Sequence, residues 1–474
     1  MAIIPTFICL ALPLAAGTLV LLSGCGAPTP AQPKVTTGPT PPAVDSSFTL
    51  VLSGDTAGFI VPCGCTTKQF GGLPRRATYL KTIPNAVYLD AGGTTARGTE
   101  YDELKLQYLW KGMLLIKPAA LNIGAGELTQ SAKGVTEVAL WSTLHWDKAS
   151  EPVPVFLATN VVPDALPKSK SWIEPDVGGI KAAIVGVCSS SAHTGQGWLI
   201  EDPKTALRRV VPELAKSHDI VILLAYADEA TCMDLIAEFP EISIVLAAGT
   251  GQPIAPKMVQ DRTIFASTAQ KGKFLAQLTV SGHRNAWKLA SGKIVELDES
   301  IKDDPDQLKN LALYKAALKE KPLDPSVTGE APALLKSLPA GYRYAGNRAC
   351  AECHTQDNVI YATTHHAAGL KTLHEKDFDF DPYCLKCHTT GYGAPGGFVN
   401  ANKTPELGGI GCESCHGPSQ AHAANPRKKT TAVAVGSCVT CHDPENSPKF
   451  NYLDYYQRIL HGKVKATQFE PKER

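Results

Sequence analysis

Short apolar runs alternate with amphipathic stretches between residues 48 and 298, which is the pattern of an α/β domain. Runs rich in Val, Ile and Leu are predicted as buried strands, and stretches with apolar residues three and four positions apart are predicted as helices. The predicted strands are Phe48–Leu52, Val87–Asp90, Val155–Asn160, Ala182–Val187, Ile220–Ala225 and Ile242–Ala247, and the predicted helices are Pro74–Thr82, Asp102–Leu115, Lys204–Lys216 and Ala230–Phe239.

A further helix is predicted at Asp306–Lys319. Asp304 and Pro305 provide a cap and a first-turn proline, and apolar residues recur after them at helical intervals. We expect residues 299–341 to form a helical linker that packs on a neighbouring domain and has no functional role of its own.

Residues 342–474 contain few long apolar runs but four copies of Cys-x-x-Cys-His. Two thiols three positions apart can each form a thioether with one haem vinyl group, while the adjoining imidazole ligates the iron. Zinc knuckles or disulfides are the alternative, but neither requires a His after every second Cys. We therefore predict a mainly α, loop-rich domain whose core is four c-type haems. The attachment residues are Cys350, Cys353, Cys384, Cys387, Cys412, Cys415, Cys438 and Cys441, and the proximal iron ligands are His354, His388, His416 and His442.

Five more histidines lie in the same block and could occupy the second axial position of each iron. A second imidazole saturates the iron and limits it to electron transfer, whereas a missing one leaves an open site for a small molecule. His365 is the weakest of the five, because neighbouring helical residues point in different directions. The distal candidates are His366, His374, His422 and His461.

The amino end resembles a bacterial lipoprotein signal. Ile3–Leu22 is almost wholly apolar and leads into Leu22-Ser23-Gly24-Cys25. The resemblance implies that residues 1–24 are removed and that Cys25 receives acyl chains, which anchor the protein to a membrane. An uncleaved membrane anchor is the alternative, because the apolar run is long enough to span a bilayer. Either way we expect the bulk of the chain in the bacterial periplasm or cell envelope, held off the membrane by a proline-rich tether at residues 25–47.

The composition of the chain limits the classes of partner that we expect it to bind. Lys and Arg number 46 against 45 Asp and Glu, without a long basic run, which argues against nucleic acid as a target. The predicted α/β domain holds four further cysteines, and an even number in an exported protein favours disulfides, with a thiolate site for zinc or iron as the alternative. These cysteines are Cys63, Cys65, Cys188 and Cys232.

Two glycine-rich segments, 54–58 and 71–76, resemble the metallophosphatase domain of 5'-nucleotidase-type enzymes. That family uses Asp and His side chains to hold two metal ions that activate water and clamp a phosphate. Here Asp55 remains, but most other ligand positions are occupied by residues that cannot bind a metal ion. The resemblance thus implies an α/β domain at residues 48–298 without phosphatase chemistry. The altered positions are Ala57, Gly93, Ala125, Gly126, Tyr226, Gly249 and Gly251.

The flanks of the haem motifs resemble the tetrahaem cytochrome family of hydroxylamine oxidation. The likeness runs through Thr364–Ala367, Cys384–Tyr392 and Gly411–Pro418. The resemblance implies electron transfer through saturated haems, although the family can leave one iron five-coordinate, and it favours His366 and His422 as distal ligands.

The sequence therefore predicts a multidomain lipoprotein that transfers electrons between redox proteins, namely donor and acceptor cytochromes or oxidoreductases. An enzyme that acts on nitric oxide or hydroxylamine at one open haem is the first alternative. A binding module in which the haems only support the phosphatase-like domain is the second.

Overall fold

The computed structural model describes residues 46–62, 69–144, 155–161, 169–189, 195–269, 271–331, 338, 341–431, 433 and 435–462. The predicted signal peptide, Cys25 and the first part of the predicted tether lie outside these residues, as do Cys63 and Cys65. The last two tether residues, Ser46 and Ser47, already belong to the first strand. In the described part of the chain, no helix is both long and apolar enough to cross a membrane.

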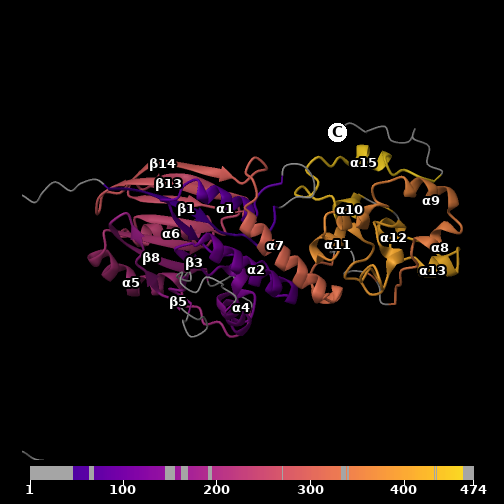
Figure 1. Cartoon of the computed structure of the whole chain (residues 1–474), viewed down its shortest axis with the longest axis horizontal. Coiled ribbons are helices and arrows are strands. Elements are labelled where there is room, and N and C mark those ends of the chain that lie inside the picture. Colours follow the sequence, from indigo (N-terminus) through magenta and orange to yellow (C-terminus); the bar gives the residue numbers. More distant parts are fainter. Residues whose placement is uncertain are drawn as a thin grey trace, which may run out of the picture. The chain divides into compact units, whose positions relative to one another are not determined.

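Two mixed β-sheets build the N-terminal part of the structure (Figure 1). In the first sheet β1 pairs in parallel with β2, with Leu50 opposite Val87, and antiparallel with β13, with Leu50 opposite Leu278. The strand order is β14-β13-β1-β2-β3-β4-β5. Its strands are β1 (Ser46–Ser53), β2 (Val87–Asp90), β3 (Ala120–Asn122), β4 (Val155–Leu157), β5 (Ser169–Lys170), β13 (Phe274–Gly282) and β14 (Lys288–Glu296).

The second sheet has the order β11-β12-β10-β9-β8-β6, and β7 pairs with β8. Its three central neighbours, β8, β9 and β10, run parallel, as expected for strands joined by crossover helices. The strands are β6 (Trp172–Ile173), β7 (Asp176–Val177), β8 (Ile180–Cys188), β9 (Ile220–Tyr226), β10 (Ile244–Ala248), β11 (Ile254–Val259) and β12 (Thr263–Ser267).

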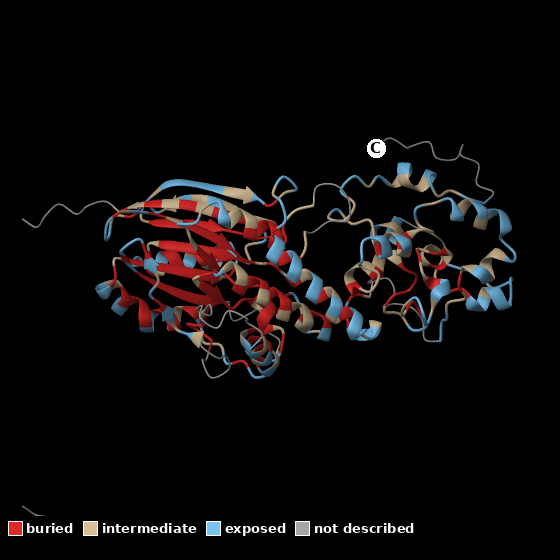
Figure 2. Cartoon of the chain, viewed as in Figure 1, coloured by how far each residue is buried: buried red, intermediate tan, exposed pale blue. Residues whose placement is uncertain are grey.

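The two sheets pack face to face, and helices cover their outer faces. Alternate residues of one strand point to opposite faces, so Leu50 and Leu52 enter the cluster between the sheets while Val51 packs under helices on the other side. Figure 2 shows the central strands of the sheets buried, whereas β14 is largely exposed. The outer helices are α1 (Leu73–Lys81), α2 (Glu100–Ile116), α3 (Ala125–Leu128), α4 (Ala132–Leu144), α5 (Pro203–Ser217), α6 (Glu229–Glu238) and α7 (Pro305–Glu320).

All six predicted strands and all five predicted helices occur, with ends shifted by a few residues at most. The prediction for residues 254–296 was incomplete, because β11 to β14 lie there. Helix α7 begins where predicted: the Asp304 side chain accepts hydrogen bonds from the backbone N–H groups of Asp306 and Gln307.

The C-terminal part consists of short helices joined by long connections, with a small apolar cluster of its own. The cluster contains Leu373, Leu385, Tyr392, Phe398 and Leu407, which is little for about 120 residues of chain. The helices are α8 (Asn347–Ala351), α9 (Thr355–Ala362), α10 (Gly369–Glu375), α11 (Pro382–His388), α12 (Cys412–His416), α13 (Gln420–Ala424), α14 (Val435–Val439) and α15 (Tyr452–Gln457).

Candidate haem-binding site

Each Cys-x-x-Cys-His motif lies on or directly beside one of these short helices. Within a motif, helical hydrogen bonds such as His354 N–H to the Cys350 carbonyl (2.9 Å) and His442 N–H to the Cys438 carbonyl (2.9 Å) set the turn. Residues three apart share a helix face, so each pair of cysteines points the same way. All eight motif cysteines are free thiols, as thioether formation requires.

Three proximal histidines face three of the predicted distal histidines. The ring centres of His354 and His422 are 6.2 Å apart, those of His366 and His442 are 6.1 Å apart, and those of His416 and His461 are 6.1 Å apart. Metal–imidazole bonds are about 2.0 Å long, so two rings that ligate one ion from opposite sides have centres about 6 Å apart. The three pairs therefore fit six-coordinate haem iron.

In several of these rings a hydrogen bond occupies one of the two nitrogens, so the second nitrogen of the same ring can bind a metal ion. His422 Nδ1 lies 2.6 Å from the Lys428 carbonyl oxygen, and His461 Nδ1 lies 2.8 Å from the Ile459 carbonyl oxygen. His442 Nδ1 lies 3.0 Å from Ser447 Oγ. A hydrogen bond at one ring nitrogen fixes the tautomer and directs the other toward a metal, as in known metal sites.

The fourth proximal histidine, His388, has different surroundings. Its Nδ1 contacts the Gly369 carbonyl oxygen at 2.9 Å, but among the described residues no histidine ring faces it as in the three pairs. His374, the remaining distal candidate, is exposed and has its Nδ1 2.8 Å from Asp379 Oδ2. His365 is also exposed. The distal candidates thus divide into three that face a proximal ring and one that does not.

Burial lowers the pKa values of His366, His388, His416 and His442, which favours the neutral imidazole. Iron binds the neutral ring through a free nitrogen lone pair. Since burial and ligation favour the same protonation state, these positions suit axial ligands.

Motifs distant in sequence lie side by side. The thiols of Cys350 and Cys412 share a hydrogen bond, which lowers the pKa of Cys412 to about 7 and raises the pKa of Cys350. A second hydrogen bond joins Cys387 to Cys441, lowering the pKa of Cys387 and raising that of Cys441. The first motif therefore adjoins the third, and the second adjoins the fourth.

Hydrogen bonds within the chain hold the residues at which the sequence predicts altered metal-ligand positions. Tyr226 donates a hydrogen bond to Asp55 Oδ1 (3.3 Å), and burial, together with the charge of Asp55, raises the pKa of the tyrosine hydroxyl. The Glu127 carboxylate accepts from the backbone N–H groups of Gly93, Thr94, Thr95 and Gly124 (2.6–3.3 Å). Within the described ranges, no group of three or more His, Cys, Asp or Glu side chains lies close enough to hold a metal ion.

Two of the cysteines that were expected to form disulfides do not form them. Cys188 and Cys232 are buried free thiols at the end of β8 and within α6, so neither forms the expected disulfide. Both are surrounded by apolar side chains in the core, and burial raises the pKa of Cys188 and raises that of Cys232 to about 12.

No sequence pattern predicts the contacts that Tyr101, Tyr314 and Glu330 make with α11 and its cap. Tyr101 and Tyr314 both donate to Asp381, and Lys386 of the second motif pairs with Glu330. Helical periodicity marked Tyr314 as an apolar position, and no sequence pattern marks a tyrosine whose hydroxyl reaches a distant carboxylate.

Residues 349–417 match the family described as cytochrome c554 and c-prime. Cytochrome c-554 of Nitrosomonas europaea is 31% identical over 112 residues, which cover 20% of this chain and 48% of that protein. The match is confined to the C-terminal part, where it supports c-type haem attachment.

The N-terminal part has different relatives. Apyrase of Aedes aegypti is 25% identical over 313 residues, or 56% of this chain and 53% of that protein. The chain thus spans about half the length of the curated relatives it matches. The crystal structure of a 5'-nucleotidase precursor from Thermus thermophilus has a TM-score of 0.50 and 16% identity, covering 76% of this chain and 73% of that one, which shows the fold alone. The predicted fold class is confirmed: an N-terminal part with the 5'-nucleotidase type of α/β fold precedes a helical region, residues 349–417, that matches the cytochrome c554 family.

Proposed function

We propose that this protein carries four c-type haems in residues 342–474 and relays single electrons between redox proteins. Three pairs of histidine rings carry the proposal. The ring centres lie about 6 Å apart in the pairs His354 and His422, His442 and His366, and His416 and His461. A c-type haem, when bound, supplies an iron that gains or loses one electron. The paired imidazoles would hold that iron in the same coordination in both oxidation states, so little rearrangement accompanies transfer.

The adjacency of the motifs supports transfer within the molecule. Thiols that share hydrogen bonds join the first motif to the third and the second to the fourth, so covalently bound haems would lie near one another in pairs. An electron accepted at one haem would then have a neighbouring acceptor.

We also propose where the protein lies in the cell and which proteins it contacts. Cleavage after residue 24, lipidation at Cys25 and the proline-rich tether would place residues 48–474 outside the cytoplasmic membrane. Haem attachment to reduced thiols and docking of donor and acceptor proteins both suit an extracytoplasmic location. Residues 48–298 would serve as a scaffold without phosphatase activity, and residues 299–341 would join it to the cytochrome domain.

A second function is favoured by one observation, the surroundings of His388. A haem on the second motif that keeps an open axial position would bind a small nitrogen compound such as nitric oxide or hydroxylamine. The chain would then be an enzyme at that haem, while the three paired positions supply or remove its electrons.

Electron paramagnetic resonance of the purified oxidised protein separates the two functions, combined with nitric oxide added to the reduced protein. Low-spin signals alone, without nitric oxide binding, support the electron relay. A high-spin signal from one haem in four that binds nitric oxide supports the enzyme. Mass spectrometry that finds fewer than four haem adducts contradicts the proposed haem content.

A further inference from the structure

A carboxylate of the haem region is held by two tyrosines from the N-terminal part and α7. Tyr101 of α2 donates to Asp381 Oδ1 at 2.5 Å, and Tyr314 of α7 donates to Asp381 Oδ2 at 3.0 Å. All three side chains are buried, and Asp381 is 5% exposed. Burial and the charge of Asp381 raise the pKa of both hydroxyls well above their usual value, so both remain protonated donors.

The charge of Asp381 is not neutralised by an ion pair with any of the described residues. Two lysines lie nearby but contact aromatic rings: Lys105 Nζ is 4.1 Å from the ring centre of Tyr101, and Lys386 Nζ is 3.9 Å from that of Tyr383. The Asp381 carboxylate also accepts a hydrogen bond from the backbone N–H of Tyr383 (2.9 Å). Asp381 is therefore a buried negative charge held by neutral donors.

Asp381 is the N-cap of α11, the helix that carries the second haem motif. Cys384 follows three residues later, about 5 Å along the helix axis at 1.5 Å per residue. The carboxylate would thus lie beside the haem attached at Cys384 and Cys387.

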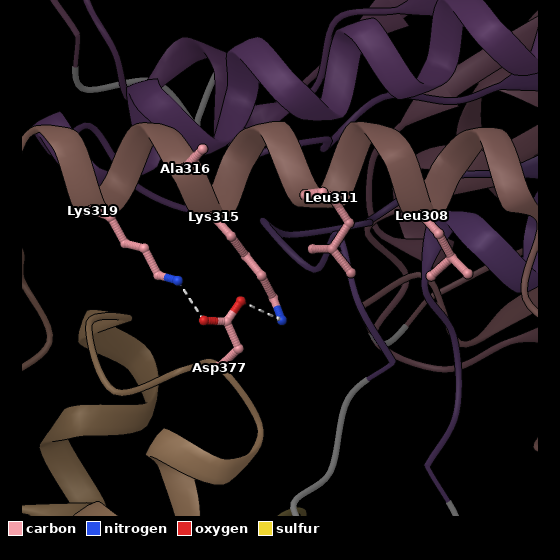
Figure 3. Close-up of a pocket in the computed structure, with 7 residues that line it drawn as sticks. Leu308, Leu311, Lys315, Ala316, Lys319 and Asp377 are labelled. Carbon is pink, nitrogen blue, oxygen red and sulfur yellow. Dashed lines mark hydrogen bonds and ion pairs between the residues drawn. The ribbon is translucent and has the colours of Figure 1, made fainter.

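Two further contacts fix this helix against the rest of the chain. Glu330, which is 3% exposed, accepts from Lys386 within the motif (2.8 Å) and pairs with Arg97 next to α2. Lys315 and Lys319 of α7 both pair with Asp377, which precedes α11, and line a pocket there with Leu308 and Leu311 (Figure 3). The helix and its capping carboxylate are therefore held from several sides.

We infer that the N-terminal part sets the reduction potential of the haem on the second motif by fixing the Asp381 carboxylate beside it. Asp381, Tyr101 and Tyr314 are positioning residues in this role. The inference rests on the proposed function, because it requires a haem at His388. Oxidised haem carries one more positive charge than reduced haem, so a nearby buried negative charge favours the oxidised form and lowers the potential.

Asp381→Asn tests the charge while keeping the helix cap, because Asn caps helices as well as Asp does. In the full-length protein with its haems, the reduced-to-oxidised ratio of the second haem at a fixed potential should rise about tenfold, which for one electron is about 59 mV. The other three haems should keep their potentials. His388→Met identifies the step that belongs to the second haem in a spectroscopic redox titration, because methionine ligation raises the potential.

The double variant Tyr101→Phe, Tyr314→Phe tests the same charge, but it should shift the potential of the second haem in the opposite direction. The variant removes the two donors that spread the charge of the Asp381 carboxylate, so the potential of the second haem should fall. This variant also keeps the inference testable if Asp381→Asn does not fold. Tyr79→Phe is the matched control, because its hydroxyl donates to Gln277 (2.5 Å) within the N-terminal part and should leave every haem unchanged.

Opposite shifts in the two variants support the inference. Unchanged potentials, or shifts in the same direction, overturn it and leave the haem proposal intact. If mass spectrometry of the wild-type protein finds no haem on the peptide containing Cys384 and Cys387, the proposed function fails at this site and the inference falls with it.

Discussion

The Tyr226 ring lies against Gly93 and Gly124, two glycines with no space for a side chain. A Cβ added at Gly93 would lie 2.4 Å from the tyrosine ring, and one added at Gly124 would lie 2.7 Å from it. Real Cβ atoms do not approach other atoms so closely, so the ring and a metal-binding side chain at residue 93 exclude each other. Gly93, Gly124 and Tyr226 therefore depend on one another, and a side chain added at either glycine requires the tyrosine ring to move.

Gly93→Asp, which places a carboxylate at one of the predicted ligand positions, should lower the free energy of unfolding by about 3 kcal/mol. The substitution adds a clash with Tyr226 to a backbone at φ 76°. Gly251→Asp is the control, because Gly251 has the same φ with nothing within 4 Å of its Cβ position, and it should cost only about 1 kcal/mol. Urea unfolding measures both, and equal costs would contradict the clash.

Single substitutions test the predicted distal histidines one at a time. His461→Ala should convert the haem of the third motif from low spin to high spin, because His461 faces His416. His374→Ala should leave the spin states unchanged, since the exposed His374 ring contacts Asp379 instead. Electron paramagnetic resonance distinguishes the outcomes; a high-spin signal in the His374 variant and none in the His461 variant would reverse the assignment.

At the scale of elements, helix α11 depends on contacts from other elements more than on its own length. It has seven residues, which is too short for stability in isolation. Its capping Asp381 and its Lys386 are both held by residues from outside the haem region, Tyr101 and Tyr314 for the first and Glu330 for the second. Changes at those contacts should therefore alter the second haem motif.

Glu330→Gln should destabilise the protein by about 2 kcal/mol at neutral pH, because it removes the buried carboxylate that pairs with both Lys386 and Arg97. Lys386 then loses this buried partner, whereas Arg97 keeps its ion pair with the buried Asp102. Burial raises the pKa of Glu330, but the ion pairs with Lys386 and Arg97 outweigh burial and hold that pKa below its usual value. The carboxylate's contribution is therefore complete above the unfolded pKa of about 4.3 and is lost as the pH falls through the lower folded value.

Thermal unfolding of wild type and Glu330→Gln across this acidic range measures the effect, and the difference between them should shrink on acidification. Glu213→Gln is the control, because its ion pair with Lys216 is exposed on both sides and should change stability by less than about 0.5 kcal/mol. A difference for Glu330 that stays constant with pH would contradict the ionic explanation.

At the scale of the whole molecule, two sheets covered by helices provide a large apolar core, whereas the haem region has a small one. The N-terminal part can fold by burying apolar side chains, but residues 342–474 would need their cofactors as core. With its haems attached, the haem region would gain the core that its own side chains do not supply, in addition to its contacts with α2 and α7.

With added Mn²⁺, the purified protein should hydrolyse nucleotides or a chromogenic phosphodiester no faster than buffer does. Asp55 keeps a carboxylate at one of the predicted ligand positions, and this carboxylate already accepts a hydrogen bond from the Tyr226 hydroxyl. A two-metal site needs several ligands to place both ions. Metal-dependent turnover that disappears in Asp55→Ala would show that the scaffold has kept phosphatase chemistry.

The sequence by itself determined the α/β alternation, the helix at Asp306–Lys319 and the four Cys-x-x-Cys-His motifs. These features are local: periodicity and spacing are read from residues close together in the chain. Of the strands missed between residues 254 and 296, β14 is largely exposed and β11 is only partly buried, which weakens their apolar pattern. This reason does not apply to β12 and β13, which are mostly buried.

Only the tertiary structure decided which histidines face each other, that His388 stands apart from the three pairs, and that Tyr101 and Tyr314 meet at Asp381. It also showed that Cys188 and Cys232 are buried thiols rather than half-cystines. These outcomes depend on residues up to 280 positions apart, whose approach is set by packing of the whole chain. Spacing along the sequence carries no information about such distances.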